Sequence, residues 1–110
     1  MNDATLTWTK SLTGTPTSYS VIWTQNGTAL PAVSTPASAG ADTSGYSQDF
    51  ATANPTVTVN PGDVIGATVQ AIDATNSLSS AVTPSVPANV TIPATPVAPG
   101  IPQNVVLALS

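Results

Sequence analysis

The sequence predicts an all-β fold, and three observations lead to this prediction. Its apolar residues are mostly Ala and Val, with abundant Thr and Ser, so short and β-branched side chains that favour strands dominate. Several segments alternate apolar and polar residues with the period of two that a half-buried strand requires. Pro, Gly and Asn residues, which favour turns, separate these segments. At 110 residues, 41% of them hydrophobic, the chain has the size of one domain with a single core.

The first predicted strand covers residues 4–9. Ala4, Leu6 and Trp8 fall on one face of it, and threonines occupy the other face. Because neighbouring side chains in a strand point to opposite faces, we expect the apolar face to be buried. Residues 11–18, which include Gly and Pro, are expected to form a loop.

The second predicted strand covers residues 19–24. Tyr19, Val21 and Trp23 share one face of it, which predicts a second half-buried strand. The pair Asn26-Gly27 follows directly, and both residues tolerate positive φ. A tight reversal is therefore expected after this strand.

The pattern of the residues that follow is less even. Residues 31–54 are rich in Ala, Ser, Pro and Gly, so we expect a long excursion with at most one short strand. Alternation returns at 56–59 and, after a turn at 60–63, in the longest strand, at 64–73. Residues 78–86 are expected to form the last strand of the sheet.

The composition changes again near the C-terminus, where six of the 11 prolines lie between Pro84 and Pro102. Proline donates no backbone hydrogen bond and fixes φ, so residues 87–98 are expected to form an extended, semi-rigid strap. The segment 99–110 that follows alternates once more, with apolar residues at Val105, Leu107 and Leu109. A strand in this position needs a sheet edge with which to pair.

Several short motifs follow one another in a distinctive order along residues 4–86. They are Trp8 in the first strand, a Tyr19-x-Val21 pair in the second, and a Pro61-Gly62 turn before the strand 64–73. This order resembles the fibronectin type III domain, an immunoglobulin-like antiparallel β-sandwich, from its second strand to its last. The resemblance implies that Trp8, Tyr19 and Val21 belong to the core.

The chain departs from this family in two places. Ile65 occupies the position where such sandwiches often carry a corner tyrosine, so the corner is expected to depend on packing. The first strand is missing from the N-terminus, and the segment 99–110 is similar to it. The prediction is a sandwich core at 1–86, a strap at 87–98 and an edge strand at 99–110 that completes the sandwich of its own or a neighbouring chain. The predicted interface consists of Ile101, Val105, Leu107 and Leu109.

Charge is nearly absent from the sequence. Lys10 is the only basic residue, and five Asp residues give a net charge of -4. Nucleic-acid binding requires clustered basic residues, so neither nucleic acid nor an anionic membrane surface is an expected partner. A surface with so few charges is weakly protected against self-association, which predicts a homo-oligomer.

The residues that support catalysis or metal binding are also scarce. The chain has no His, Cys or Glu, so it offers neither a general base suited to neutral pH nor a thiol nucleophile, and we do not expect an enzyme or a cofactor. Asp42 and Asp49 are the best pair for calcium, but calcium needs more oxygen ligands in one short loop, so solvated carboxylates are expected instead.

The two tryptophans raise a carbohydrate-stacking hypothesis. Trp8 has apolar neighbours at alternate positions and is assigned to the core. Trp23 ends its strand beside Gln25 and Asn26, so it is the candidate ligand-facing residue, with a surface glycan as its partner.

These observations favour a non-enzymatic structural protein. The composition is similar to that of extracellular or virion β-modules, whereas residues 1–3 carry no features of a secretory leader and predict production in the cytosol. A bacteriophage virion protein fits both, as a capsid-decorating (cement) or tail-associated protein that assembles through its C-terminal strand with itself and a capsid or tail protein. The alternative is a secreted bacterial adhesion or glycan-binding fibronectin type III module, cut from a larger repeat protein and located at the cell surface.

Overall fold

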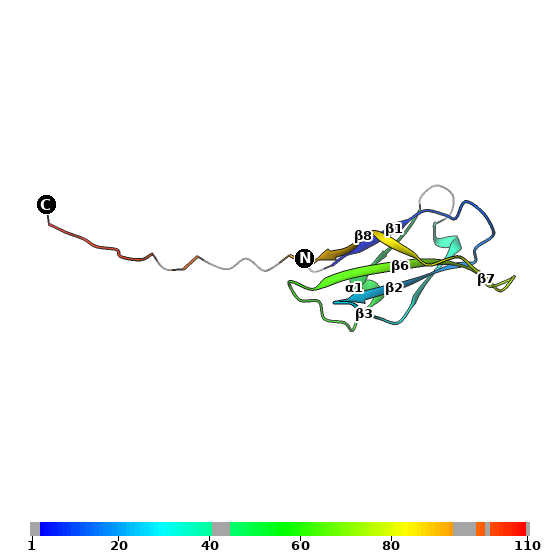
Figure 1. The fold of residues 1–110 in the computed structure, drawn as a ribbon, viewed down its shortest axis with the longest axis horizontal. Helices are drawn as coiled ribbons and strands as arrows, with labels where there is room; N and C mark the ends of the chain where they lie inside the picture. The colour runs from blue at the N-terminus through cyan, green and yellow to red at the C-terminus, as the bar shows by residue number, and fades with distance from the viewer. Residues whose placement is uncertain (1–2, 41–44, 94–98, 101, 110) are drawn as a thin grey trace.

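The computed structural model describes residues 3–40, 45–93, 99–100 and 102–109. These residues form an all-β architecture in which every strand pair is antiparallel (Figure 1). Helical structure in this part of the chain is limited to a 3-10 turn, η1 (Ala37–Gly40), and one helical turn, α1 (Phe50–Ala53). The prediction of an all-β fold is confirmed.

The smaller of two sheets pairs β1 (Thr5–Trp8) with β5 (Tyr46–Asp49). In this ladder Thr5 lies opposite Asp49, and Trp8 lies opposite Tyr46. Within β1 the threonines are exposed, whereas Leu6 and Trp8 are partly buried, as the alternation predicted.

The larger sheet has six strands, built around β2 (Ser18–Gln25) and β6 (Val64–Asp73), which pair along their whole shared length. The other edge of β2 carries β3 (Thr28–Ala29) and β4 (Val33–Pro36), and the other edge of β6 carries β7 (Leu78–Ser79) and β8 (Thr83–Thr91). Asn26 and Gly27 both have positive φ between β2 and β3, which confirms the predicted reversal.

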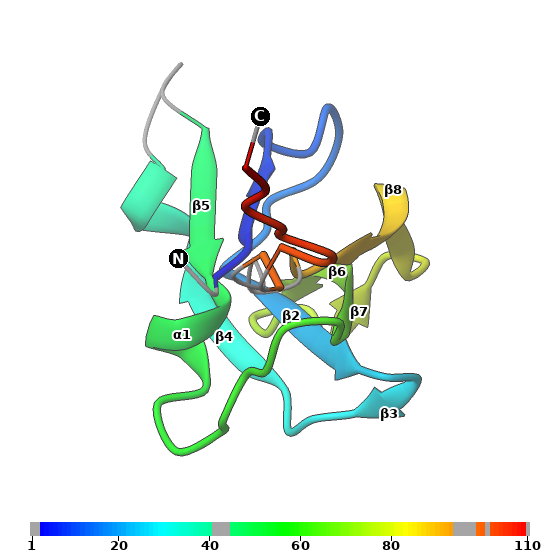
Figure 2. The ribbon, with the colours of Figure 1, turned by 90° about the vertical axis from the view of Figure 1, so that its left-hand side faces the viewer.

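The core lies between the two sheets. Val21 and Trp23 of β2 contact Ile65 and Ala67 of β6 there, and Phe50 lies against them from the other layer. Leu6 and Trp8 of β1, together with Ala4 just before it, pack against this cluster. Figure 2, viewed along the long axis, separates β1 and β5 from the sheet of β2 and β6. Two antiparallel layers around one core are compatible with a β-sandwich.

The middle of the chain differs from the prediction of at most one short strand. It contains two, β4 and β5, each of which pairs with an N-terminal strand. Residues 56–59, by contrast, form no strand. The amide of Val57 donates to Asn54 O within a turn, and Thr58 O accepts from the Gln25 side chain. Val57 and Val59 are still packed against the core, so their apolar alternation reports burial rather than strand pairing.

The end of the sheet also differs from the predicted boundary at residue 86. The last strand divides into β7 and β8, and β8 continues to Thr91, after which Ile92 is buried in the core. Pro84 and Pro87 are tolerated here because β8 is an edge strand, and its pairing with β6 shifts register between Gly66 and Thr68. The predicted strap therefore begins later than residue 87, and its residues 94–98 lie outside the described residues.

The C-terminal segment does not join either sheet. Residues 99–100 and 102–109 belong to no strand and are exposed. They extend from one end of the two-layered body, which gives the molecule extents of 87 × 29 × 21 Å (Figure 1). Within a single copy, the alternative in which this segment folds back onto its own domain is therefore not found.

Candidate functional site

The strand β1 has one paired edge and one open edge. Phe50 N donates to Ala4 O over 2.8 Å, so Ala4 and Phe50, which lie opposite each other, form a hydrogen-bonded pair of the ladder. Antiparallel ladders alternate, so the backbone groups of Leu6 and Trp8 face β5, whereas those of Thr5 and Thr7 face away from it. Among the described strands, β5 is the only one that pairs with β1.

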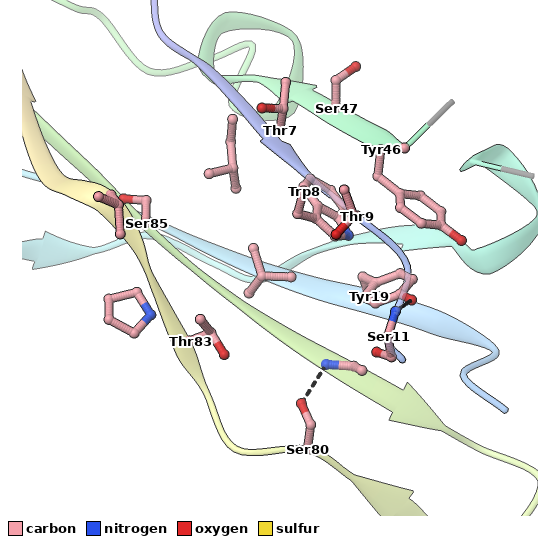
Figure 3. A pocket seen from close by; sticks show the side chains of 16 residues that line it. Thr7, Trp8, Thr9, Ser11, Tyr19, Tyr46, Ser47, Ser80, Thr83 and Ser85 are labelled. Carbon is pink, nitrogen blue, oxygen red and sulfur yellow. Dashed lines mark hydrogen bonds between the residues drawn. The ribbon is translucent and has the colours of Figure 1, made fainter. Parts of the chain in front are cut away.

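A cavity of about 740 Å³ lies along this open edge, between the two sheets. Leu6, Thr7 and Trp8 line it from β1, and Thr83 and Ser85 line it from β8. Figure 3 shows Trp8, Tyr19 and Tyr46 on one side of the cavity and Thr83 and Ser85 on the other. None of the described residues that line it is charged, and most of its polar groups are hydroxyls.

A second, smaller cavity of about 170 Å³ continues the first. The two share Leu6, Thr7, Ser85 and Val86 in their walls. At its far end the second cavity is lined by residues that include Ala4 and Val90. We call the two together the β1–β8 groove; it follows β1 and the residues on either side of it, from Ala4 to Thr9.

Three aromatic rings form one end of the groove. The ring centroids of Trp8 and Tyr46 are 5.5 Å apart, those of Tyr19 and Tyr46 are 4.6 Å apart, and those of Trp8 and Tyr19 are 5.9 Å apart. Both tyrosines are buried, and their hydroxyls hold neighbouring loops: Ser11 N donates to Tyr19 Oη, and Tyr46 Oη donates to Ala37 O. Burial, followed by the proximity of Tyr19, raises the pKa of Tyr46, so this phenol stays protonated near neutral pH.

Of the two tryptophans, Trp8 packs against the core as expected, and Trp23 differs from its predicted role. Trp23, the candidate ligand-facing residue, is 2% exposed, and its Nε1 donates to Gln48 Oε1 over 2.7 Å. Trp8 is partly buried, lines the larger cavity, and its buried Nε1 has no hydrogen-bond partner among the described residues. Trp23 is buried because its face of β2 is covered by Phe50 from the opposite layer, with ring centroids 5.4 Å apart.

The predicted interface residues are placed away from the groove of their own copy. Val105 is 81% exposed, and Leu107 and Leu109 are fully exposed. Val106, which was not among the predicted interface residues, is 82% exposed. Ile101 lies outside the described residues.

The carboxylates take part in local hydrogen bonding. Asp49 Oδ1 accepts from Thr5 Oγ1 across the β1–β5 ladder, and Asp42 lies outside the described residues. Asp63 accepts from the Asn60 amide and from the side chains of Asn26 and Gln25, and these bonds hold its pKa below the usual range. Within the described ranges, no three residues that could ligate a metal ion come together.

Comparisons with protein-family models, with curated proteins and with solved structures find no match to this chain. The described residues also include no helix of the length and apolarity needed to cross a membrane. The function must therefore be inferred from the geometry of the chain itself. Two features stand out: an open, uncharged groove beside β1, and an exposed apolar segment at the C-terminus.

Proposed function

We propose that this chain is a non-enzymatic structural protein that assembles through its C-terminal segment. The order of the described strands supports a fibronectin type III or immunoglobulin-like sandwich, in which β1 takes the place of the second strand. In such sandwiches the second strand pairs with the fifth, and the third pairs with the sixth and stands in the opposite sheet. The pairs β1–β5 and β2–β6 correspond to this arrangement.

The exposure of the C-terminal segment carries the proposal. Val105, Leu107 and Leu109 alternate, and none of them is shielded within its own copy. Each large apolar side chain left in water forgoes about 1.5–3 kcal/mol of burial free energy. Contiguous exposed apolar residues mark surfaces that bind a partner. A partner that covers this segment would recover that free energy.

The setting that we propose is a bacteriophage virion, in which the protein decorates the capsid or belongs to the tail. Repeated contact between identical subunits is the basis of both structures, and a subunit with an open sheet edge and an exposed apolar segment suits such contacts. The few charged residues of the sequence suit a surface that is covered by neighbours. The same residue inventory, without His, Cys or Glu, supports a structural rather than a catalytic role.

Sedimentation of the full chain tests the assembly. We expect the wild-type protein to form oligomers, and a variant with Val105→Asp, Leu107→Asp and Leu109→Asp to remain monomeric. Leu12→Asp is the control, because Leu12 is equally exposed, lies in a loop and does not itself line the groove. If the variant with the three Asp substitutions sediments like the wild type, the proposed function is contradicted. Electron microscopy of particles labelled through this chain then tests the virion setting.

A glycan-binding adhesion module is the second candidate, and one observation favours it. The larger cavity combines the Trp8 ring with hydroxyl groups, a combination suited to a sugar. A glycan array tests this function. Binding that is lost in Trp8→Ala and retained in Leu12→Asp would support it, and an array without binders would oppose it.

A further inference from the structure

We propose that the β1–β8 groove of one copy binds residues 102–109 of a second copy as an added strand, antiparallel to β1. This inference rests on the proposed assembly through the C-terminal segment. It adds the acceptor, the direction and the alignment of the two strands.

The acceptor side is the open edge of β1. The backbone groups of Thr5 and Thr7 face this edge, and no described strand occupies it. An extended peptide can satisfy such groups by adding a strand, with its side chains at alternate positions entering the space beneath. The groove provides that space, since its two cavities lie directly beside β1 from Ala4 to Thr9.

The donor side has the matching pattern. Val105, Leu107 and Leu109 fall on one face of an extended segment, and Val106 and Ala108 fall on the other. The groove has no charged residue among its described lining, so it suits the larger apolar face of the segment. The segment itself carries no charged side chain that would oppose burial.

The direction follows from how the strands run. Ala4 and Val90 line one end of the groove, and Trp8 and Thr83 line the other, so β1 and β8 run in opposite directions along it. The C-terminal segment leaves the body at the end where β8 finishes, beside the N-terminal end of β1 (Figure 1). A copy placed beyond that end, in the same orientation, presents the Trp8 end of its groove to the arriving segment.

A segment that enters at the Trp8 end runs antiparallel to β1, which is the more stable form of pairing. The segment of the same copy starts at the Ala4 end and would have to reverse and then run parallel to β1. Direction therefore favours a second copy as the donor. The contact is heterologous, so the copies form an open filament or, if the rotation between them closes, a ring.

The inward faces of the two strands set the alignment. Side chains of directly opposed residues lie on the same side of a ladder, so inward residues of the donor must lie opposite inward residues of β1. Only one alignment matches all three large donor residues with the three inward positions: Val105 opposite Trp8, Leu107 opposite Leu6, and Leu109 opposite Ala4. Val106 then lies opposite Thr7, with both side chains on the solvent side, and the Thr7 backbone faces the donor.

Cross-linking between two copies tests the alignment, and the absence of cysteine from the sequence makes the result unambiguous. One copy carries Thr7→Cys and the other carries Val106→Cys. Opposed residues of a hydrogen-bonded pair lie about 5.5 Å apart, within disulfide reach. We expect disulfide dimers to form about tenfold faster, or more, than between Leu12→Cys and Val106→Cys copies, because strand pairing raises the effective thiol concentration.

A second variant tests the acceptor without thiols. Thr7→Pro removes an amide that faces the open edge, a position where an edge strand tolerates proline. This variant can still donate its C-terminal segment, whereas Leu107→Asp can still accept one. Each alone is expected to be monomeric, and an equal mixture is expected to give dimers but no longer species. Circular dichroism of both variants checks that they remain folded.

The outcomes separate the inference from the proposed function. If Leu107→Asp prevents assembly but Thr7→Pro assembles like the wild type and no Thr7–Val106 cross-link forms, the groove is not the acceptor, although the C-terminal segment still joins the copies. If the Leu107→Asp variant assembles normally, both proposals fall. A cross-link from Val106→Cys to Thr5→Cys in preference to Thr7→Cys would overturn the alignment.

Discussion

Trp8 and Tyr46 stack with ring centroids 5.5 Å apart and ring planes 11° from parallel. These residues are opposite partners in the β1–β5 ladder, so the stack holds the two strands together at the rim of the β1–β8 groove. Tyr19 of β2 contacts both rings from the other sheet. The aromatic cluster therefore fixes the spacing of the two layers at the end of the groove where the larger cavity lies.

Removal of the Tyr46 ring should destabilise the protein strongly. Tyr46→Ala deletes both ring contacts and leaves a void, and substitutions of this kind cost about 3–5 kcal/mol in a core. Tyr46→Phe keeps the ring and loses only the hydrogen bond to Ala37 O, which is worth about 1 kcal/mol. Urea unfolding of the two variants measures both free energies. Equal losses would mean that the stack contributes nothing beyond the hydroxyl.

The fluorescence of Trp8 should report assembly at the groove. Trp23 is buried and hydrogen-bonded to Gln48, whereas Trp8 lines the cavity that the donor strand is proposed to enter. In a Trp23→Phe variant, Trp8 is the only indole, and its fluorescence should shift to shorter wavelength as concentration drives assembly. The Trp8→Phe variant, which retains Trp23, should show no such shift. A shift confined to the Trp8→Phe variant would place the contact elsewhere.

The sequence predicted the strands whose alternation is strict and whose inward residues are large. Trp8 in β1, and Tyr19 and Val21 in β2, face inward as expected. The sequence pattern did not predict strand pairing where the two partners lie far apart in the sequence. The pairing of β5 with β1 gives Tyr46 its place in the groove, and nothing in the surrounding Ala, Ser and Gly residues indicated that contact. The exposure of Trp23 was likewise misjudged, because Phe50, which covers it, lies in the same loosely patterned region.

The close approach of β8 to β6 should make Gly66 sensitive to any side chain. A Cβ at this position would lie 2.6 Å from Asn89 Oδ1, 2.7 Å from Thr24 Oγ1 and 2.9 Å from Ala88 O. Gly66→Ala therefore has to displace the backbone of β8, and overpacking of this kind costs about 1–3 kcal/mol. Gly100→Ala is the control, because a Cβ at Gly100 meets nothing within 4 Å. Thermal melts of the two variants should differ, and identical midpoints would contradict the close packing.

The turn between residues 60 and 63 should lose stability in acid. Hydrogen bonds from the Asn60 amide, then from the Asn26 and Gln25 side chains, lower the pKa of Asp63 from 3.8 in the folded protein. A folded-state pKa below the unfolded value means that the unfolded chain takes up a proton first, so acid favours unfolding. The stabilisation is complete above the ordinary pKa and is lost as the pH falls through the lowered one.

Asp63→Asn tests this dependence, because an amide does not titrate in this range. Its unfolding free energy should be lower than that of the wild type at neutral pH, since Asn60 loses a charged acceptor. The difference in unfolding free energy between the two proteins should narrow as the pH falls below 3.8, because the Asp63 carboxylate of the wild type is then protonated and the amide of the Asp63→Asn variant is not. Asp73, whose pKa is lowered chiefly by the Asn76 side chain, should add an acid dependence of the same sign to both proteins, so it cancels from their difference. Parallel curves for the wild type and Asp63→Asn down to low pH would show that the Asp63 hydrogen bonds do not favour the charged carboxylate.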